Sequence, residues 1–309
     1  GAERPRGDGG RHVAAAVHLA PSIFRSDYQQ PALAPGVTLS RAPRWLKRGF
    51  WWSLDRLLLD PQVAPALNQF RQDQGLAPVA RVMGAWMHSP RRVIGLFPDW
   101  FGPPQPDWPA NTRLVGFPLW DTHEAAELSR DVREFLAAGD APIAFSPGSA
   151  NREAHQFFTA AVDACQRLGR RGILLTKYAE QLPTKLPPSV RHFGFVPLSR
   201  LLPHTAAMVH HGGIGSCAQG LAAGVPHLVR PMAFDQFDNS RRLVRLGVAE
   251  EISVKAFRGP AIAAALSRLV TSAEVATNCR ALAARCDGTA SLTAACVALD
   301  QLAPAPLAR

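Results

Sequence analysis

A chain of 309 residues, 47% of them hydrophobic, is long enough for two globular domains of ordinary size. It contains no apolar run of membrane-spanning length and no signal-peptide pattern, so we expect a cytoplasmic protein. The five cysteines include no Cys-x-x-Cys pair, which argues against a disulfide framework or a zinc site. The net charge of +10 suits a nucleic acid, an anionic membrane surface or a phosphorylated substrate, but no nucleic-acid-binding module is recognisable and we expect no nucleic-acid partner.

The first 121 residues predict one incomplete α/β domain. Residues 1–11 are glycine-rich and charged, so we expect them to be disordered and the domain to cover residues 12–121. Short apolar runs predict three buried strands, over 13–19, 92–97 and 113–116. Residues 98–109 carry too many prolines for a helix or a central strand, and they predict an ordered loop that is held by three aromatic side chains, Trp100, Phe101 and Trp108.

Two amphipathic helices are expected between the first two strands. The first covers residues 42–60 and is interrupted by Pro61, and the second covers 63–74 with Gly75 as its stop. The first helix is rich in aromatic residues beside two cations: Trp45, Phe50, Trp51 and Trp52 accompany Lys47 and Arg48. We interpret the aromatic side chains as core and the cations as surface. An apolar acceptor pocket, or a surface lying on lipid, is the alternative.

The remainder of the chain alternates strands and helices. A polar helix over 122–138 is predicted to connect the halves, and residues 139–309 to form the second domain. The most informative stretch begins with an apolar strand over 206–210, followed by a glycine turn, a helix over 216–223 and another strand. Because free N–H groups at a helix N-terminus attract anions, we expect a phosphate site here, flanked by His211 and Ser216. No Gly-Lys-Ser/Thr follows the glycines, so the turn is not a Walker loop, and a packing role for His211 is the alternative.

This stretch resembles the donor-binding signature of family 1 glycosyltransferases, which include bacterial macrolide, sterol and rhamnolipid glycosyltransferases. The matching residues are His211, Gly212-Gly213, Gly215-Ser216, Gly224-Val225-Pro226 and Asp235-Gln236. The resemblance implies an α/β fold of the GT-B type, with two Rossmann-like domains facing a cleft and the last helix crossing back onto the first domain. It also implies that a nucleotide sugar binds to the second domain as a substrate, with no cofactor and no metal. No Asp-x-Asp motif occurs, which agrees with a metal-free mechanism.

The resemblance assigns donor contacts residue by residue. The diphosphate is expected at the amino end of the helix, and the full set of expected donor-binding residues is His211, Gly213, Gly215, Ser216, Gln219, Asp235, Gln236, Phe195, Pro197 and Ser149. Within this set, Asp235 and Gln236 are expected on the sugar hydroxyls and Phe195 on the base, with a core position for Phe195 as the alternative. Asp235 and Gln236 are expected in a loop that opens a helix at about Ser240, and the alternative is that Asp238 or Asn239 simply caps that helix. Gln219 stands where many relatives carry Glu, and Leu198 where they carry Gln, so the base stays open between UDP and dTDP.

The expected reaction is inverting transfer of a hexose to an acceptor hydroxyl on a small lipid or natural product. Relatives open with a strand and a glycine-rich turn carrying a general-base His, and neither His12 nor His18 follows such a turn. We therefore assign no catalytic residue and expect the chain to bind donor but to transfer sugar poorly. A non-catalytic nucleotide-sugar-binding subunit and a GT-B-fold epimerase are the alternatives. Peripheral contact with the inner face of the membrane is left open.

Overall fold

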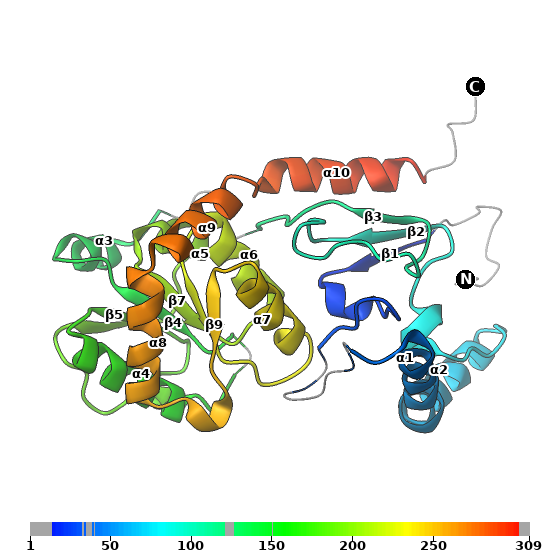
Figure 1. Ribbon diagram of the computed structural model, residues 1–309, viewed down its shortest axis with the longest axis horizontal. Helices are drawn as coiled ribbons and strands as arrows, with labels where there is room; N and C mark the ends of the chain where they lie inside the picture. Colours follow the sequence, from blue (N-terminus) through cyan, green and yellow to red (C-terminus); the bar gives the residue numbers. More distant parts are fainter. Residues whose placement is uncertain are drawn as a thin grey trace. The chain divides into compact units, whose positions relative to one another are not determined.

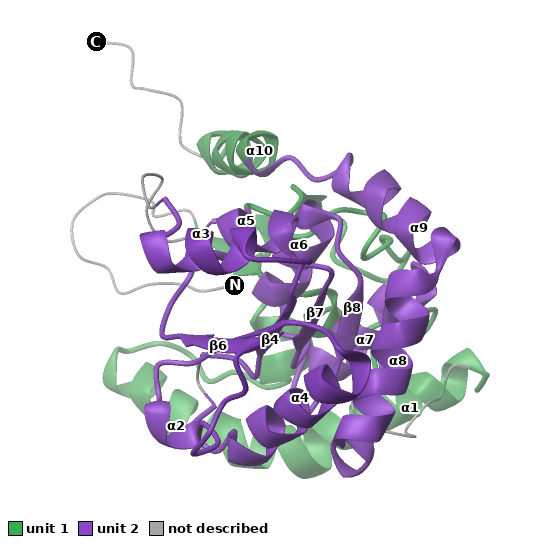
Figure 2. Ribbon diagram, turned by 90° about the vertical axis from the view of Figure 1, so that its left-hand side faces the viewer, with its two compact units in different colours: residues 1–118, 289–309 green, residues 119–288 purple. Residues whose placement is uncertain are grey.

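The computed structural model describes residues 14–32, 34, 39, 41–120, 127–149 and 151–302. The chain divides into two compact units, of which unit 1 comprises residues 1–118 with 289–309 and unit 2 comprises residues 119–288 (Figure 2). The last helix, α10 (Gly288–Asp300), thus belongs almost wholly to unit 1, as the resemblance implied. The disorder expected over residues 1–11 falls outside the described residues. No helix in the described ranges is both long and apolar enough to cross a bilayer.

Unit 2 is built on a parallel sheet of six strands in the order β6-β5-β4-β7-β8-β9. The strands are β4 (Ile143–Ser146), β5 (Gly172–Leu175), β6 (Val190–Phe193), β7 (Ala207–His210), β8 (His227–Val229) and β9 (Ala249–Glu251). This is the Rossmann order, in which the chain starts in the middle of the sheet and later returns to build the other half. The sequence did not reveal β9, because two of its three residues are glutamates, which an edge strand tolerates.

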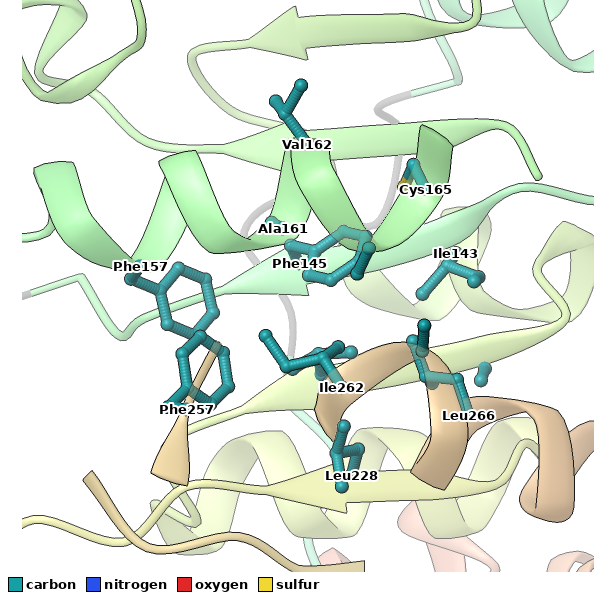
Figure 3. Packing of buried hydrophobic residues seen from close by; sticks show 14 of the residues in the cluster. Ile143, Phe145, Phe157, Ala161, Val162, Cys165, Leu228, Phe257, Ile262 and Leu266 are labelled. Carbon is teal, nitrogen blue, oxygen red and sulfur yellow. The ribbon is translucent and has the colours of Figure 1, made fainter. Parts of the chain in front are cut away.

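Helices cover both faces of this sheet. They are α3 (Arg130–Ala137), α4 (His155–Leu168), α5 (Leu198–Leu201), α6 (Ile214–Ala223), α7 (Gln236–Arg245), α8 (Gly259–Thr271) and α9 (Ala273–Ala283). On one face, Phe145 and Leu228 of the sheet pack against α4 and α8 (Figure 3). On the other face, Ile173 packs with Val132 and Phe135 of α3. Side chains of neighbouring strand residues point to opposite faces, so each strand serves both layers.

The helix predicted over 122–138 is shorter in the structure. It begins at Arg130, where the Ser129 hydroxyl accepts a hydrogen bond from the Val132 N–H. Serine is a favoured N-cap residue, and this cap explains the start. Residues 121–126 lie outside the described part of the chain, so the front of the predicted helix is not described.

Unit 1 contains three parallel strands in its described part, β1 (Ala15–His18), β2 (Arg92–Gly95) and β3 (Thr112–Leu114), paired in that order. All three overlap the predicted runs, but only β2 is largely buried: Val17 of β1 is 49% exposed, and β3 begins one residue early and has no buried residue. Ala298 of α10 packs against Ile94 and Val115 of this unit. The proline-rich loop that precedes β3 is held, as predicted, by buried Phe101 and Trp108.

The two helices predicted before β2 are in fact one continuous helical segment (Figure 1). It consists of α1 (Arg44–Leu54), a π-helical turn (Asp55–Leu59) and α2 (Asp60–Asp73), so the interruption predicted at Pro61 is wrong. Pro61 stands in the first turn of α2, next to the widened π turn, where its missing N–H is tolerated. The predicted stop is confirmed, because Gly75 follows with φ +69°.

The aromatic side chains of α1 are only partly core. Trp51 is buried, but Trp45 and Trp52 are 72% and 60% exposed. Lys47, predicted on the surface, is buried, and its Nζ donates to the Tyr28 carbonyl at 3.3 Å. The inward face of the helix therefore carries positions 47, 51 and 55, and helical geometry turns the other two tryptophans outward. Our core interpretation is wrong for Trp45 and Trp52, and our surface interpretation is wrong for Lys47.

Candidate functional site

The candidate site lies where the sheet of unit 2 changes direction. Strands β4 and β7 are neighbours, with Ser146 paired to His210, and the chain runs outward from them in opposite directions. In open parallel sheets, such a switch point leaves a crevice at the carboxyl ends of the two central strands. The loops that leave these two strands carry Gly148 and Ser149 on one side and His211 on the other.

A cavity of about 930 Å³ opens at this place, lined by residues of unit 2. Seven of the ten predicted donor residues line it: Ser149, Phe195, His211, Gly215, Ser216, Gln219 and Gln236. The other three predicted residues are sequence neighbours of lining residues but are not among the described lining residues themselves: Gly213, Pro197 and Asp235. The structure therefore brings most of the predicted set together around one hollow, although their contact with a donor stays a prediction.

The amino end of α6 faces this cavity. The helix begins at Ile214, two residues before the predicted start, with Gly213 in the N-cap position and no side-chain cap. The first N–H groups of a helix have no acceptor within the helix, and the first turn of α6 contains no acidic residue that would attract them. Because Gly215 and Ser216 line the cavity, this partly positive end is open to a ligand.

The imidazole of His211 is held beside the helix end by two glycines. A methyl group on Gly213 would lie 2.5 Å from its Nε2, and one on Gly148 would lie 2.9 Å from its Cε1. Burial lowers the pKa of His211, against an opposing effect of the Asp235 charge. The ring is therefore neutral at neutral pH and has one N–H to donate.

The Nδ1 atom of His211 is buried and has no hydrogen-bond partner within the described structure. An unpaired buried polar atom is costly. The Nε2 atom of His227, a residue of the core, is likewise buried without a partner among the described residues, so the unpaired nitrogen alone does not exclude the packing alternative. His211 differs from His227 because it lines the cavity.

A pair of histidines that the sequence did not single out, His210 and His227, holds the glycine turn after β7. The Gly212 N–H donates to His210 Nδ1 at 3.1 Å, and His210 Nε2 lies 2.9 Å from His227 Nδ1. Since His210 Nδ1 accepts, its proton is on Nε2 and is donated to His227. Both rings are fully buried, and burial lowers the pKa of His210 well below its ordinary value and that of His227 to about 3. The pair is neutral and fixes the turn at Gly212, which has φ +92°.

Helix α7 starts at Gln236, four residues before the predicted start near Ser240. Asp235 takes the N-cap position in a turn, as the expected loop required, but Gln236 is already helical, and the alternative caps Asp238 and Asn239 are wrong. The earlier start is stabilised by a buried ion pair between Asp238 and Arg242 at 2.6 Å. Polar residues in the first turn concealed this start from the sequence pattern.

The start of α7 also fixes what its polar side chains can offer. The Asn239 amide donates to the Gly212 carbonyl at 3.0 Å and to Asp235 Oδ2 at 2.8 Å, which joins α7 to the glycine turn. The side-chain Oε1 of Gln236 accepts hydrogen bonds from the backbone N–H groups of Met232 and Ala233. The Gln236 side chain therefore keeps its amide N–H groups for the cavity.

Aromatic side chains stand at the cavity with their rings in solvent. Phe195 is 59% exposed, so the core alternative for this residue is wrong. Pro197 is buried and starts α5, whose first turn it stabilises by accepting from the Leu201 N–H. Trp120 and Phe234 also line the cavity and are 68% and 87% exposed. The sequence analysis missed both, and large aromatic residues beside the Phe-Pro-Leu and Asp-Gln segments were the available signal.

The loop after β5 forms another part of the cavity lining. Thr176 donates its hydroxyl to Gln181 Oε1 at 2.9 Å, and the Gln181 amide donates to the Asn151 carbonyl at 2.9 Å. This chain of bonds joins the exits of β4 and β5, and both Thr176 and Asn151 line the cavity. Gln219, largely buried on α6, lines it too.

Comparison with known proteins agrees with this geometry. Residues 167–298 match the family model of the erythromycin biosynthesis protein CIII-like C-terminal domain. Over 252 residues the chain is 31% identical to O-mycaminosyltylonolide 6-deoxyallosyltransferase of Streptomyces fradiae, a match that covers 77% of this chain and 56% of that protein. The chain belongs to the family 1 glycosyltransferases. It is also 28% identical over 238 residues to glycosyltransferase GtfC of Amycolatopsis orientalis, covering 77% of this chain and 55% of that one.

Solved structures show the same fold. The glycotransferase of kitacinnamycin superposes with a TM-score of 0.68 at 23% identity, over 84% of this chain and 67% of the other. Glycosyltransferase VinC, solved in complex with DTDP, superposes with a TM-score of 0.59 at 22% identity, over 83% of this chain and 64% of the other. The fold of this family 1 member is therefore GT-B. The chain spans little more than half the length of the two curated relatives named above.

Proposed function

We propose that the protein moves a hexose from a UDP- or dTDP-linked sugar to an acceptor hydroxyl, with inversion and without a metal. The acceptor is a small lipid or natural product. The relatives named for sugar transfer support the reaction class, and the VinC complex with DTDP supports the donor class. The donor would occupy the cavity of unit 2.

One observation carries the proposal: the uncapped amino end of α6 opens into the cavity beside a buried His211 Nδ1 without a partner. A diphosphate supplies the negative charge that the helix end favours and the acceptor oxygens that a neutral imidazole N–H needs. Both features call for the same ligand chemistry at one place. Neither alone would distinguish a donor site from an ordinary α/β turn.

In the proposed reaction, the acceptor oxygen forms a bond to the anomeric carbon of the sugar. The bond from that carbon to the diphosphate oxygen breaks, and the electron pair leaves with the nucleoside diphosphate. Negative charge grows on the leaving oxygen, and the α6 helix end, the His211 N–H and the Ser216 hydroxyl would stabilise it. The acceptor hydroxyl loses its proton to a base, to which we assign no residue.

The remaining lining residues would position the nucleoside and the sugar. Phe195 presents an exposed ring face on which a base can stack, which does not depend on the identity of that base. Gln219 would bond a ribose hydroxyl. The free amide N–H groups of Gln236 would donate to sugar hydroxyls. A contact of Asp235 with the sugar stays a prediction from the resemblance, because Asp235 is not among the described lining residues and its Oδ2 accepts from Asn239. Rhamnose as the sugar stays a prediction from the sequence resemblance.

Isothermal titration of the whole chain with UDP, dTDP and their hexose conjugates tests donor binding. We expect His211→Ala to weaken the affinity about 10- to 100-fold, the effect of losing one hydrogen bond to a charged group. His204→Ala, an exposed histidine elsewhere in unit 2, is the matched control and should change nothing. Equal affinity of wild type and His211→Ala for these nucleotides would contradict the proposal.

A transfer assay with the same donors and a hydrophobic alcohol as acceptor tests the activity separately. We expect product of inverted configuration at a low rate, formed equally well in the presence of EDTA. Donor binding without transfer would instead favour the non-catalytic nucleotide-sugar-binding alternative. The two assays therefore distinguish failure of the site from failure of the chemistry.

A further inference from the structure

The polarity of α1 is reversed with respect to that of an ordinary surface helix. Its inward face holds two charged side chains, Lys47 and Asp55, which are 4% and 3% exposed. Asp55 is paired there with Arg25 at 2.5 Å, and Lys47 donates to the Tyr28 carbonyl at 3.3 Å. Of the three tryptophans of the helix, Trp51 is buried on the inward face, whereas Trp45 and Trp52 face solvent. Exposed tryptophans of this size indicate a surface that is covered when the protein functions.

The two outward tryptophans alternate with arginines. Trp45, Arg48, Trp52 and Arg56 follow one another at intervals of three, four and four residues, which places them on one side of the helix. We name these four residues the Trp–Arg face. The neighbouring Arg41 and Arg44 are exposed as well, and Arg44 lies over the Tyr28 ring.

Positive charge dominates this part of the surface. From position 41 to position 59 four arginines are exposed, Arg41, Arg44, Arg48 and Arg56, and the one acidic residue, Asp55, is buried in its ion pair. Arg48 contacts Asp27 at 2.9 Å, but its side chain stays 70% exposed. The occupant of the Trp–Arg face must therefore be apolar enough to cover two indole rings and acidic enough to match the arginines.

We propose that the Trp–Arg face binds an anionic lipid surface, with the indole rings at the level of the headgroups. Tryptophan rings are enriched at the level of the lipid headgroups, and arginines beside them are attracted to anionic lipids. A second copy of the chain is a poor occupant, because a symmetric contact through this face would gather four arginines, two from each copy, without an exposed carboxylate of the face to match them. This contact is independent of the glycosyl transfer proposed for unit 2.

Sedimentation with vesicles tests the proposal on the whole chain. Vesicles of equal parts phosphatidylcholine and phosphatidylglycerol should bind the protein, and vesicles of phosphatidylcholine alone should bind it much less. Binding should fall when salt is raised from about 0.1 M to about 1 M, which shortens the Debye length from about 10 Å to about 3 Å. Lipids brominated near the headgroup should quench tryptophan fluorescence in the same mixtures.

Two double variants separate the contributions. Trp45→Ser with Trp52→Ser should lower the partition coefficient by at least about tenfold and remove most of the bromolipid quenching. Arg48→Gln with Arg56→Gln should lower it about thirtyfold, at about fivefold for each arginine near an anionic surface. The control pair Arg130→Gln with Arg167→Gln removes two exposed arginines from unit 2 and should have a smaller effect.

Circular dichroism must show the native fold for each variant, which is expected because the altered side chains are exposed. Equal binding of wild type and the tryptophan variant to anionic vesicles would overturn the proposal. So would absence of vesicle binding by the wild type together with a dimer or a complex with an acidic protein that the tryptophan variant loses. That result would assign the face to a protein partner.

Discussion

Helices α1 and α4 are both amphipathic, but they bury side chains of different polarity. In unit 2, α4 buries Phe157, Phe158 and Val162 against the sheet and leaves Arg167 in solvent. In unit 1, α1 buries Lys47 and exposes Trp45. Both segments are amphipathic, so the period predicts a helix in each case. The period does not say which face is inside, because buried partners such as Arg25 for Asp55 come from distant parts of the chain.

The largest expected effect is the loss of stability when a buried side chain of α4, rather than an exposed side chain of α1, is truncated. Phe158→Ala removes a side chain with no exposed surface from α4 and should lower the free energy of unfolding of unit 2 by about 3 to 5 kcal/mol. Trp45→Ala on α1 removes a larger side chain but should change stability by less than about 0.5 kcal/mol, because that ring is in water. Urea unfolding followed by circular dichroism compares the two. A similar loss for both variants would show that Trp45 is packed.

The inward charges of α1 give the next test. Asp55→Ala leaves Arg25 without its partner in a site where the aspartate side chain is 5% exposed and the arginine 14%. Breaking a buried pair from one side is strongly destabilising, and we expect a loss of about 3 kcal/mol. The exposed pair of Asp163 and Arg167 on α4 is the matched control, and Asp163→Ala should cost less than about 0.5 kcal/mol. Thermal unfolding of the two variants measures the difference.

Sequence patterns predicted most of the elements and the site signature, but not their orientations or partners. The order of strands and glycines around His211 is local, and local chemistry sufficed to place the helix end to within two residues, whereas the phosphate site stays a prediction. The packing of Gly148 on His211 joins residues more than 60 positions apart, and no pattern within one segment reports it. The same holds for Trp120 and Phe234 at the cavity. Helix α7 was placed too late because its first turn contains more polar residues than apolar ones.

Each unit contains a buried histidine pair, and acid should distinguish them. His18 and His88 lie 3.0 Å apart in unit 1, where burial lowers the pKa of His18 to about 4. In unit 2, burial lowers the pKa of His227 to about 3. Since the unfolded chain binds these protons near pH 6.5, stability is complete above that value and is lost as the pH falls toward the folded-state pKa. We expect a loss of about 2 kcal/mol for each such histidine at pH 5.

Below pH 4 the contributions of the two pairs to stability should differ. There His18 is already protonated in the folded state and costs no more, whereas His227 continues to destabilise unit 2. His227→Gln should therefore flatten the fall of the melting temperature of unit 2 from pH 6.5 to about pH 3, whereas His18→Gln should flatten that of unit 1 only from pH 6.5 to about pH 4. Thermal scans in a series of buffers measure this. A pH profile unchanged by His227→Gln would show that this ring is charged or open to water.

The smallest expected effect concerns two glycines of one helix end. A methyl group on Gly213 would lie 2.5 Å from the His211 ring, whereas a methyl group on Gly215 would meet nothing within 4 Å. Gly213→Ala should therefore cost about 1 to 3 kcal/mol by overpacking. Gly215→Ala should raise the stability by up to about 1 kcal/mol, because alanine is the better helix former. Urea unfolding without ligand measures both.

If the two variants were equally stable, His211 would have moved aside at no cost, and its ring would not be held at the helix end. The comparison matters because a fixed imidazole can stabilise the leaving diphosphate without first being ordered by it. Gly213, the N-cap residue of α6, is required because the His211 ring packs against it. Gly215, two residues later, leaves open space at the end of the helix where a ligand can approach. That division of roles is what a binding turn requires and what an ordinary strand-to-helix turn does not.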